Sequence, residues 1–177
     1  VSKLVFDYIA GWEKSTEYGT IVVPGALEHF SNEIGGEWRS RMQTILIDSS
    51  QLESGESMKD EFKKIAAREI EDFKREYELR FPGRDANKLT DEDLLREVMN
   101  TVGKKGKLGE YIRCVVSVSM LTEGWDANTV THILGVRAFT TQLLCEQVVG
   151  RGLRRRSYAL DEETGHFVPE YAEIYGI

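Results

Sequence analysis

Two short apolar runs constrain the fold of this chain more than any other feature of its sequence. Thr44–Asp48 is compact and apolar, and Tyr111–Val118 is apolar and rich in β-branched residues. Runs of this kind are typical of strands that are buried in a parallel sheet. Because segments with helical spacing lie between and around them, the sequence predicts an α/β fold with an open, mostly parallel sheet flanked by helices.

The remaining elements follow from the spacing of the apolar residues. This spacing predicts helices over residues 1–10, 58–80, about 90–102 and 140–149, and further strands over residues 20–23 and 131–136. Thr90 and Asp93 have the spacing of a capping box, which supports the start of the third helix. The region around Asn32, Gly35 and Gly36 is predicted to be a loop that allows a helical turn near Phe30.

Length and composition indicate a globular chain. With 177 residues, of which 41% are hydrophobic and 30% charged, we expect one domain that spans residues 1–177. Because the sequence opens on Val1 and ends on Ile177 without closing signals, we interpret it as a fragment of a longer protein. The apolar runs are too short to cross a bilayer, and no secretory leader opens the chain, so we expect no membrane partner. Cys114 and Cys145 lie in apolar segments without C-x-x-C spacing, which predicts buried thiols in a reducing, cytoplasmic compartment and no metal site. The three histidines, His29, His132 and His166, are scattered and lack ligand spacing.

Charge is unevenly distributed along the chain. The net charge of −7 argues against a protein that binds nucleic acid through bulk electrostatics alone. Two clusters are nevertheless basic: Lys104, Lys105 and Lys107, and the arginine cluster of Arg151, Arg154, Arg155 and Arg156. A local basic patch can bind phosphate even within an acidic domain.

Two segments resemble nucleotide-binding motifs but lack their context. The stretch Gly103–Lys107 contains glycines and lysines, yet a Walker A loop requires G-x-x-x-x-G-K-S/T followed by a helix, whereas here Leu108 and a predicted strand follow. The acidic run Asp91–Asp93 does not follow a buried apolar strand, as a magnesium-binding acidic box would. We interpret the first segment as a basic surface turn, which allows contact with a nucleic-acid backbone, and the second as a helix cap.

A Gly-x-Asp turn follows the predicted strand 111–118. It consists of Gly124 and Asp126 within the stretch Ser119-Met-Leu-Thr-Glu-Gly-Trp-Asp126. Open α/β sheets bind ligands at the carboxyl ends of their strands, where a glycine permits close approach and an aspartate offers an acceptor to a ribose hydroxyl or to another loop. The turn alone is a weak signal, because Gly-x-Asp is common.

The arginine cluster has a specific register. Gln147, Gly150, Arg151 and Arg154 form the pattern Q-x-x-G-R-x-x-R at the end of the last predicted helix. The forked guanidinium of arginine suits phosphate oxygens, and an arginine supplied across an interface can accelerate phosphoryl transfer by roughly 10³–10⁵. The alternative is a basic helix end that complements the helix dipole. That alternative explains neither the register of Gln147 and Gly150 nor the upstream Gly-x-Asp turn.

Together, residues 111–156 resemble motifs V and VI of superfamily 2 helicases. The sequence of these residues is similar to that of the restriction (Res) subunit of type III restriction enzymes and of related DEAD/DEAH-type proteins. The resemblance implies a partial RecA-like fold, the helicase C-terminal domain, which is the second of two motor domains. It also implies a charged helical insertion at about residues 55–105.

The resemblance also implies roles for individual residues. Arg154 would be the arginine finger and Arg151 would contact the γ-phosphate. The same ATP cleft would be lined by Gln147, Gly150, Gly124 and Asp126, whereas Thr122 and Glu123 would couple it to nucleic acid.

The implied partners lie mostly outside this sequence. ATP and Mg²⁺ would be bound mainly by the N-terminal RecA-like domain of the same chain, and the motor would act on double-stranded DNA, with a modification methyltransferase as a further partner. The 177 residues contain no Walker A loop and no nuclease signature, so we expect this piece alone to be inactive.

Two alternatives stay open at this stage. The same two motifs occur in RNA helicases and in DNA-repair translocases, and substrate choice is set mostly outside these residues. A non-enzymatic α/β module could also bind nucleic acid or a protein through the arginine cluster, although such binding would require no fixed register.

Overall fold

The computed structural model describes residues 1–48, 63, 65–118, 125–136 and 141–176. They form a mixed α/β structure in two compact units, Val1–Met120 and Leu121–Ile177. The expectation of one domain over residues 1–177 stays a prediction. No helix within the described ranges is both long and apolar enough to cross a membrane.

A parallel strand pair lies at the centre of the first unit. Strand β5 (Thr44–Asp48) pairs with β6 (Cys114–Val118) from Thr44↔Cys114 to Asp48↔Val118. Both apolar runs are therefore strands, and they are parallel as predicted. Strand β6 begins three residues later than expected, because the N–H groups of Arg113 and Cys114 both donate to the carbonyl of Gln43, at 2.7 and 3.0 Å.

Helix α1 (Ser2–Ala10) packs against β5 and β6, with Ala10, Ile45 and Ile47 buried. The residues of β6 are only half-buried. We had expected both thiols to be buried. Cys114 on β6 and Cys145 in the second unit are instead half-buried. Burial raises the pKa of the Cys114 thiol.

Two antiparallel hairpins follow α1. Strand β1 (Gly11–Thr16) pairs with β2 (Gly19–Pro24), and the short β3 (Glu33–Ile34) pairs with β4 (Glu37–Trp38), after a 3-10 turn η1 (Glu28–Phe30). The β2 strand and the turn at Phe30 match the sequence-based expectations. Strand β1 was not predicted, because its side chains after Gly11 are exposed and mostly polar. The segment around Asn32, Gly35 and Gly36, which was expected to be a loop, forms the short hairpin β3–β4.

The buried side chain of Asn32 connects these elements. It is 0% exposed, and its Oδ1 accepts hydrogen bonds from the N–H groups of Gln43 and Thr44, at 2.7 and 2.9 Å. Its Nδ2 donates to the Thr44 carbonyl at 2.8 Å, and its own N–H donates to the Ala10 carbonyl at 2.7 Å. One residue therefore joins the end of α1 to the start of β5.

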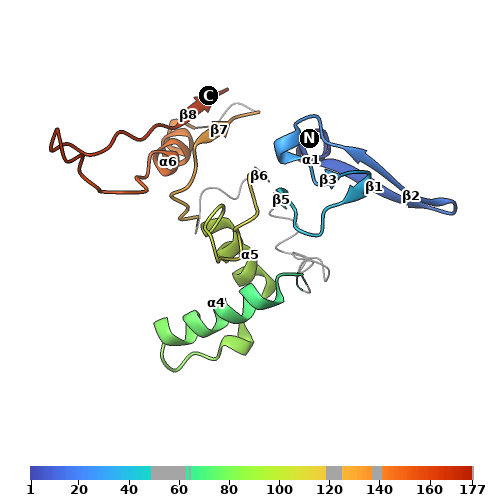
Figure 1. Ribbon diagram of the computed structural model, residues 1–177, viewed down its shortest axis with the longest axis horizontal. Coiled ribbons are helices and arrows are strands. Elements are labelled where there is room, and N and C mark those ends of the chain that lie inside the picture. The colour runs from blue at the N-terminus through green and yellow to red at the C-terminus, as the bar shows by residue number, and fades with distance from the viewer. Residues whose placement is uncertain (49–62, 64, 119–124, 137–140, 177) are drawn as a thin grey trace. The chain divides into compact units, whose positions relative to one another are not determined.

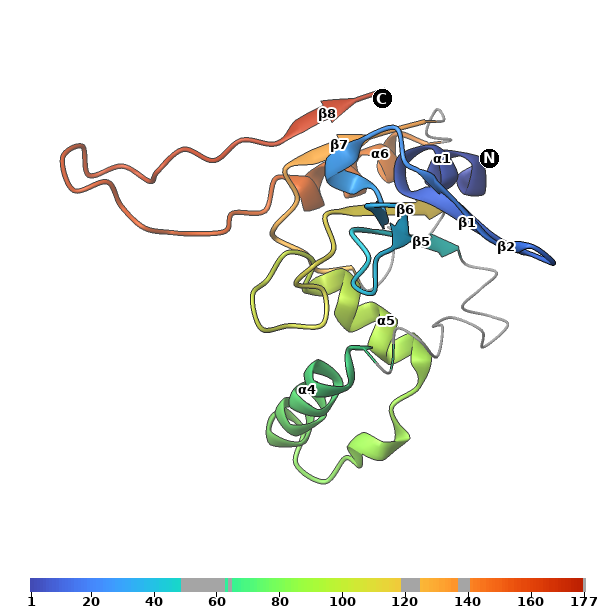
Figure 2. The ribbon, with the colours of Figure 1, turned by 45° about the vertical axis from the view of Figure 1, so that its right-hand side comes forward.

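The connection from β5 to β6 carries α4 (Ala67–Arg80), the 3-10 turn η2 (Ala86–Lys88) and α5 (Asp91–Asn100) (Figures 1 and 2). The turn η2 packs against α4. The predicted capping box of Thr90 and Asp93 is present, and the acidic residues 91–93 occupy the first turn of α5. Helix α5 ends two residues before the predicted position. The start of the predicted helix 58–80 lies partly outside the described residues, at 58–62 and 64.

The Gly-Lys segment after α5 is a turn, as we interpreted it. Gly103 has a φ of 69° and donates to the Gly109 carbonyl at 2.8 Å. The ammonium of Lys107 pairs with the carboxylate of Glu76 on α4, and strand β6 follows. Contact of this turn with a nucleic-acid backbone stays a prediction.

The second unit contains another parallel pair, β7 (His132–Leu134) and β8 (Glu173–Tyr175), and helix α6 (Gln142–Gly152). Helix α6 extends three residues beyond the predicted 149, whereas β7 is shorter than the predicted strand 131–136. Between α6 and β8 the chain forms a long arm, residues 153–172, which leaves the helix and returns to the strand (Figure 2).

The described strands form four two-stranded sheets rather than the one open sheet that we expected. Two pairs are parallel and two are antiparallel. The difference arises because the two hairpins between residues 11 and 38 pair locally, and because the two parallel pairs belong to different units. The structure therefore bears out the α/β class in its coarse form.

Removal of the Asn32 side chain is expected to destabilise the first unit. Asn32→Ala leaves two N–H donors and one carbonyl without their partner in a buried place, which we expect to cost about 2–4 kcal/mol of the free energy of unfolding. Urea unfolding measures this loss. Asn87→Ala, at an exposed position of η2, is the matched control and should change stability by no more than about 0.5 kcal/mol. Equal losses in the two variants would contradict the connecting role of Asn32.

A second prediction concerns the pH dependence of stability. Burial raises the pKa of Glu97 on α5, and nearby Glu76 adds to this, although Lys107 and other cations oppose it. Because the folded pKa lies above the usual 4.5, the folded state binds more protons, and Glu97 lowers stability progressively as pH rises through this window. Glu97→Gln should therefore stabilise the chain at pH 7 and have little effect below pH 4.5.

Urea midpoints of wild type and Glu97→Gln at both pH values test this. Glu78→Gln, on an exposed part of α4, controls for the loss of one negative charge. If Glu97→Gln gained more stability at low pH than at pH 7, the predicted direction of the pH dependence would be wrong.

Candidate functional site

The helix that carries the Q-x-x-G-R-x-x-R pattern is defined at both ends. Its N-cap is Thr141, whose side chain accepts a hydrogen bond from the N–H of Leu144 at 3.2 Å. At the other end the N–H of Leu153 donates to the Val149 carbonyl at 3.0 Å, and the N–H of Arg154 donates to the Arg151 carbonyl at 3.3 Å. The first three pattern residues therefore lie on the last turns of α6, and Arg154 lies just beyond its end.

The buried residues of α6 are Val148 and Gly152, and Gly152 lies against β7. A Cβ atom added to Gly152 would lie 2.6 Å from Cδ1 of Ile133 on β7, so a small residue is needed there. Sequence reasoning did not single out Gly152, which occupies a variable position of the pattern. The one sequence feature that could have indicated its burial is its position four residues after the apolar Val148, which places both residues on the same face of a helix.

The other pattern residues lie away from this packed face. Gln147 and Gly150 are exposed and Arg151 is half-buried. A Cβ atom on Gly150 would meet no atom within 4 Å. Glycine inside a helix is less stable than alanine by about 1 kcal/mol. No contact of the described residues accounts for that cost.

An ion pair joins the two predicted motifs. Nη1 of Arg154 contacts Oδ1 of Asp126. Asp126 lies between the buried residues Trp125 and Ala127, and its side chain is 76% exposed, whereas that of Arg154 is 42% exposed. Pairs this exposed contribute about 0–1 kcal/mol, so the contact positions the two side chains more than it stabilises the fold.

The remaining residues of the first motif lie outside the described ranges. These are Thr122, Glu123 and Gly124, and their roles stay predictions. The structure therefore brings together one member of the first motif, Asp126, and one member of the second, Arg154.

One member of the arginine cluster, Arg155, is bonded within the arm 153–172. Arg155 donates to the carbonyls of Ser157 and Val168, at 3.1 and 2.7 Å, and its guanidinium lies 4.9 Å from the ring centre of Phe167. It therefore closes the base of the arm 153–172. The backbone N–H of Arg156 donates to Glu170 at 2.8 Å.

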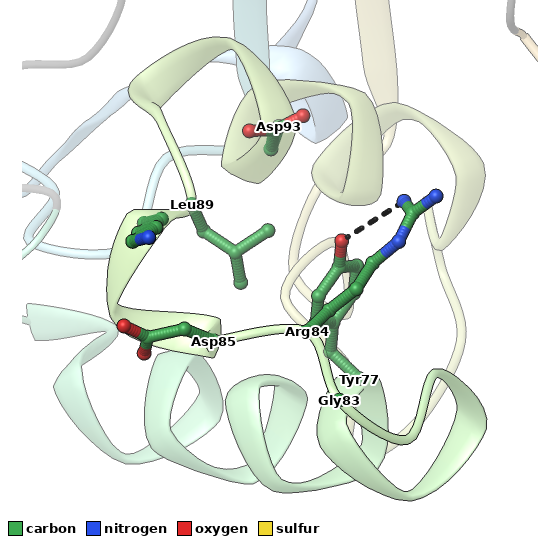
Figure 3. Close-up of a pocket in the computed structure, with 7 residues that line it drawn as sticks. Tyr77, Gly83, Arg84, Asp85, Leu89 and Asp93 are labelled. Carbon is green, nitrogen blue, oxygen red and sulfur yellow. Dashed lines mark hydrogen bonds between the residues drawn. The ribbon is translucent and has the colours of Figure 1, made fainter.

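The first unit has a shallow hollow beside α4 and α5 (Figure 3). Its volume is about 300 Å³, and it is lined by Tyr77, Gly83, Arg84, Asp85, Lys88, Leu89 and Asp93. Nη1 of Arg84 donates to the hydroxyl oxygen of Tyr77 at 3.4 Å, which raises the pKa of that guanidinium. Asp85 and Asp93 already accept bonds from nearby N–H groups, at Asn87 and Thr90 respectively. These bonded groups serve local structure, and we assign no ligand to the hollow.

Among the described residues, no group of three or more histidines, cysteines or carboxylates could hold a metal ion. Comparisons with protein-family models, with curated proteins and with solved structures found no match to this chain. The resemblance to helicases therefore stays a prediction that depends on the quoted motifs.

The two glycines at the end of α6 are expected to respond in opposite ways. Gly150→Ala adds a methyl group in open space and improves helix propensity, which should stabilise the second unit by about 0.5–1 kcal/mol. Gly152→Val places a branched side chain against Ile133 and should destabilise it by about 1–3 kcal/mol. Thermal unfolding of the two variants beside wild type measures both. A destabilised Gly150→Ala would mean that this glycine serves the fold after all.

Proposed function

We propose that this chain is the C-terminal motor half of an ATP-dependent DNA helicase or translocase of superfamily 2, related to the Res subunit of type III restriction enzymes. Its fold would be the second RecA-like domain. The parallel pair β5–β6, joined by a helical connection, is compatible with neighbouring strands of such a sheet. The longer chain would hydrolyse ATP, and this piece alone would not.

The contact between Arg154 and Asp126 carries the proposal. A Gly-x-Asp turn and a register of arginines are each common, but here one residue of each meets in space although the two are far apart in sequence. The exposed Gly150 lies on the same stretch of α6 as Arg151, four residues before Arg154. The guanidinium of Arg154 and the open helix surface at Gly150 therefore lie within four residues of each other in the sequence.

The chemistry of these residues fits a nucleotide phosphate. A guanidinium is always charged and offers parallel N–H donors, so Arg151 and Arg154 would bind phosphate oxygens and neutralise the charge that spreads over them during transfer. The small surface at Gly150 would allow the opposing domain to approach the helix. ATP and Mg²⁺ would be held mainly by the first motor domain of the same chain, and DNA would bind across both.

The central test is removal of Arg154. In the full-length protein, Arg154→Ala should lower DNA-stimulated ATP turnover by roughly 10³–10⁵ while the fold is retained, because the side chain is partly exposed and outside the packed face of α6. Arg156→Ala is the matched control, since it removes the same charge two residues away and should leave turnover nearly unchanged. Circular dichroism checks the folding of both.

The same turnover assay shows which nucleic acid stimulates the protein. Turnover that double-stranded DNA stimulates more than single-stranded DNA or RNA supports the restriction-type motor, whereas stimulation by RNA alone would support an RNA helicase. Normal turnover in a folded Arg154→Ala protein would remove the arginine-finger assignment. Salt-dependent DNA binding without ATP turnover would instead indicate a binding module.

A further inference from the structure

We propose that Asp126 is the resting partner of Arg154. It would hold the guanidinium while no nucleotide phosphate is bound, and it would release the guanidinium to the phosphate when ATP binds. This inference rests on the proposed function and gives Asp126 a role other than that of a ribose-binding acceptor. Asp126 is then a positioning residue that acts through Arg154.

The ion pair itself is the first reason. Oδ1 of Asp126 contacts Nη1 of Arg154, which is one of the donors that an arginine finger would turn toward a phosphate. A phosphate at that position would place a second anion beside the carboxylate, and the two would repel each other. At Nη1 the phosphate and the Asp126 carboxylate would therefore compete.

The exposure of the pair is the second reason. The Asp126 side chain is 76% exposed and that of Arg154 is 42% exposed, so the exchange of one anion for another does not leave a fully buried charge without a partner. A buried pair would resist such an exchange. The contact is strong enough to bias the position of one side chain and weak enough to be replaced by a ligand with more negative charge.

The backbone around Arg154 is the third reason. On one side it is fixed to the end of α6 through the carbonyls of Val149 and Arg151. On the other side Arg155 is bonded to the carbonyls of Ser157 and Val168 at the base of the arm. With the chain fixed before and after Arg154, the exchange requires rotation of its side chain and no rearrangement of the helix.

The sign of one affinity change distinguishes this role from ribose binding. If Asp126 competes with phosphate for Arg154, its removal should strengthen ATP binding by about 2- to 5-fold, the range that an exposed ion pair allows. If Asp126 instead accepts a hydrogen bond from a ribose hydroxyl, its removal should weaken ATP binding. KM for ATP should fall in the first case, with a smaller change in kcat.

The experiment uses the full-length protein and a non-hydrolysable ATP analogue with Mg²⁺ in titration calorimetry. Asp126→Asn keeps the shape and removes the charge, and it should bind the analogue about 2- to 5-fold more tightly than wild type. Asp126→Glu keeps the charge and should retain the wild-type Kd. In an Arg154→Ala background, Asp126→Asn should have little of this effect, because the competing partner is gone.

Weaker or unchanged binding in Asp126→Asn would overturn the resting-partner role. So would a loss of preference for the ATP analogue over its 2′-deoxy form in that variant, which indicates a ribose contact. Neither result would contradict the assignment of Arg154 as the arginine finger, provided that Arg154→Ala still abolishes ATP turnover. Failure of the wild-type protein to bind the analogue at all would overturn the proposed function and this inference together.

Discussion

The first unit depends on one amide that is buried where α1, the β3–β4 hairpin and β5 meet. Asn32 satisfies the N–H groups and the carbonyl at the start of β5, and its own backbone bonds to the carbonyl of Ala10. A buried backbone group without a partner costs more than a typical hydrogen bond gains, so the amide fixes where β5 begins. The register of β5 on β6 follows from that starting point, and α1 covers the pair.

In the second unit, the absence of a side chain has a similar effect. Gly152 allows α6 to approach Ile133 on β7, and this packing sets which face of the helix is turned outward. Gly150 and Gln147 are consequently exposed, and Arg154 leaves the helix end where it can reach Asp126. The geometry of the candidate site is thus a consequence of ordinary helix–strand packing, to which the polar residues add little stability.

Much of the local structure could be predicted from the sequence. The strand 44–48, the capping box of Thr90 and Asp93 and the helix that follows Thr141 all depend on side chains close to one another in the chain, which local patterns report well. Strand β1 could not be predicted in this way, since its exposed polar residues form a strand only because β2 pairs with them. The role of Arg155 in the arm could not be predicted for a similar reason, because the carbonyl of Val168 that accepts its hydrogen bond lies beyond a turn of the arm.

The sequence by itself determined the apolar runs that become parallel strands, and it determined the order and type of the residues in the candidate site. These depend on composition and on spacing along the chain, which do not require the fold. Only the tertiary structure decided that Asp126 meets Arg154, that Arg155 closes the arm, and that Gly152 rather than Gly150 faces the strand. Each of these depends on which distant groups come within a few ångströms, and a linear pattern carries no information about that distance.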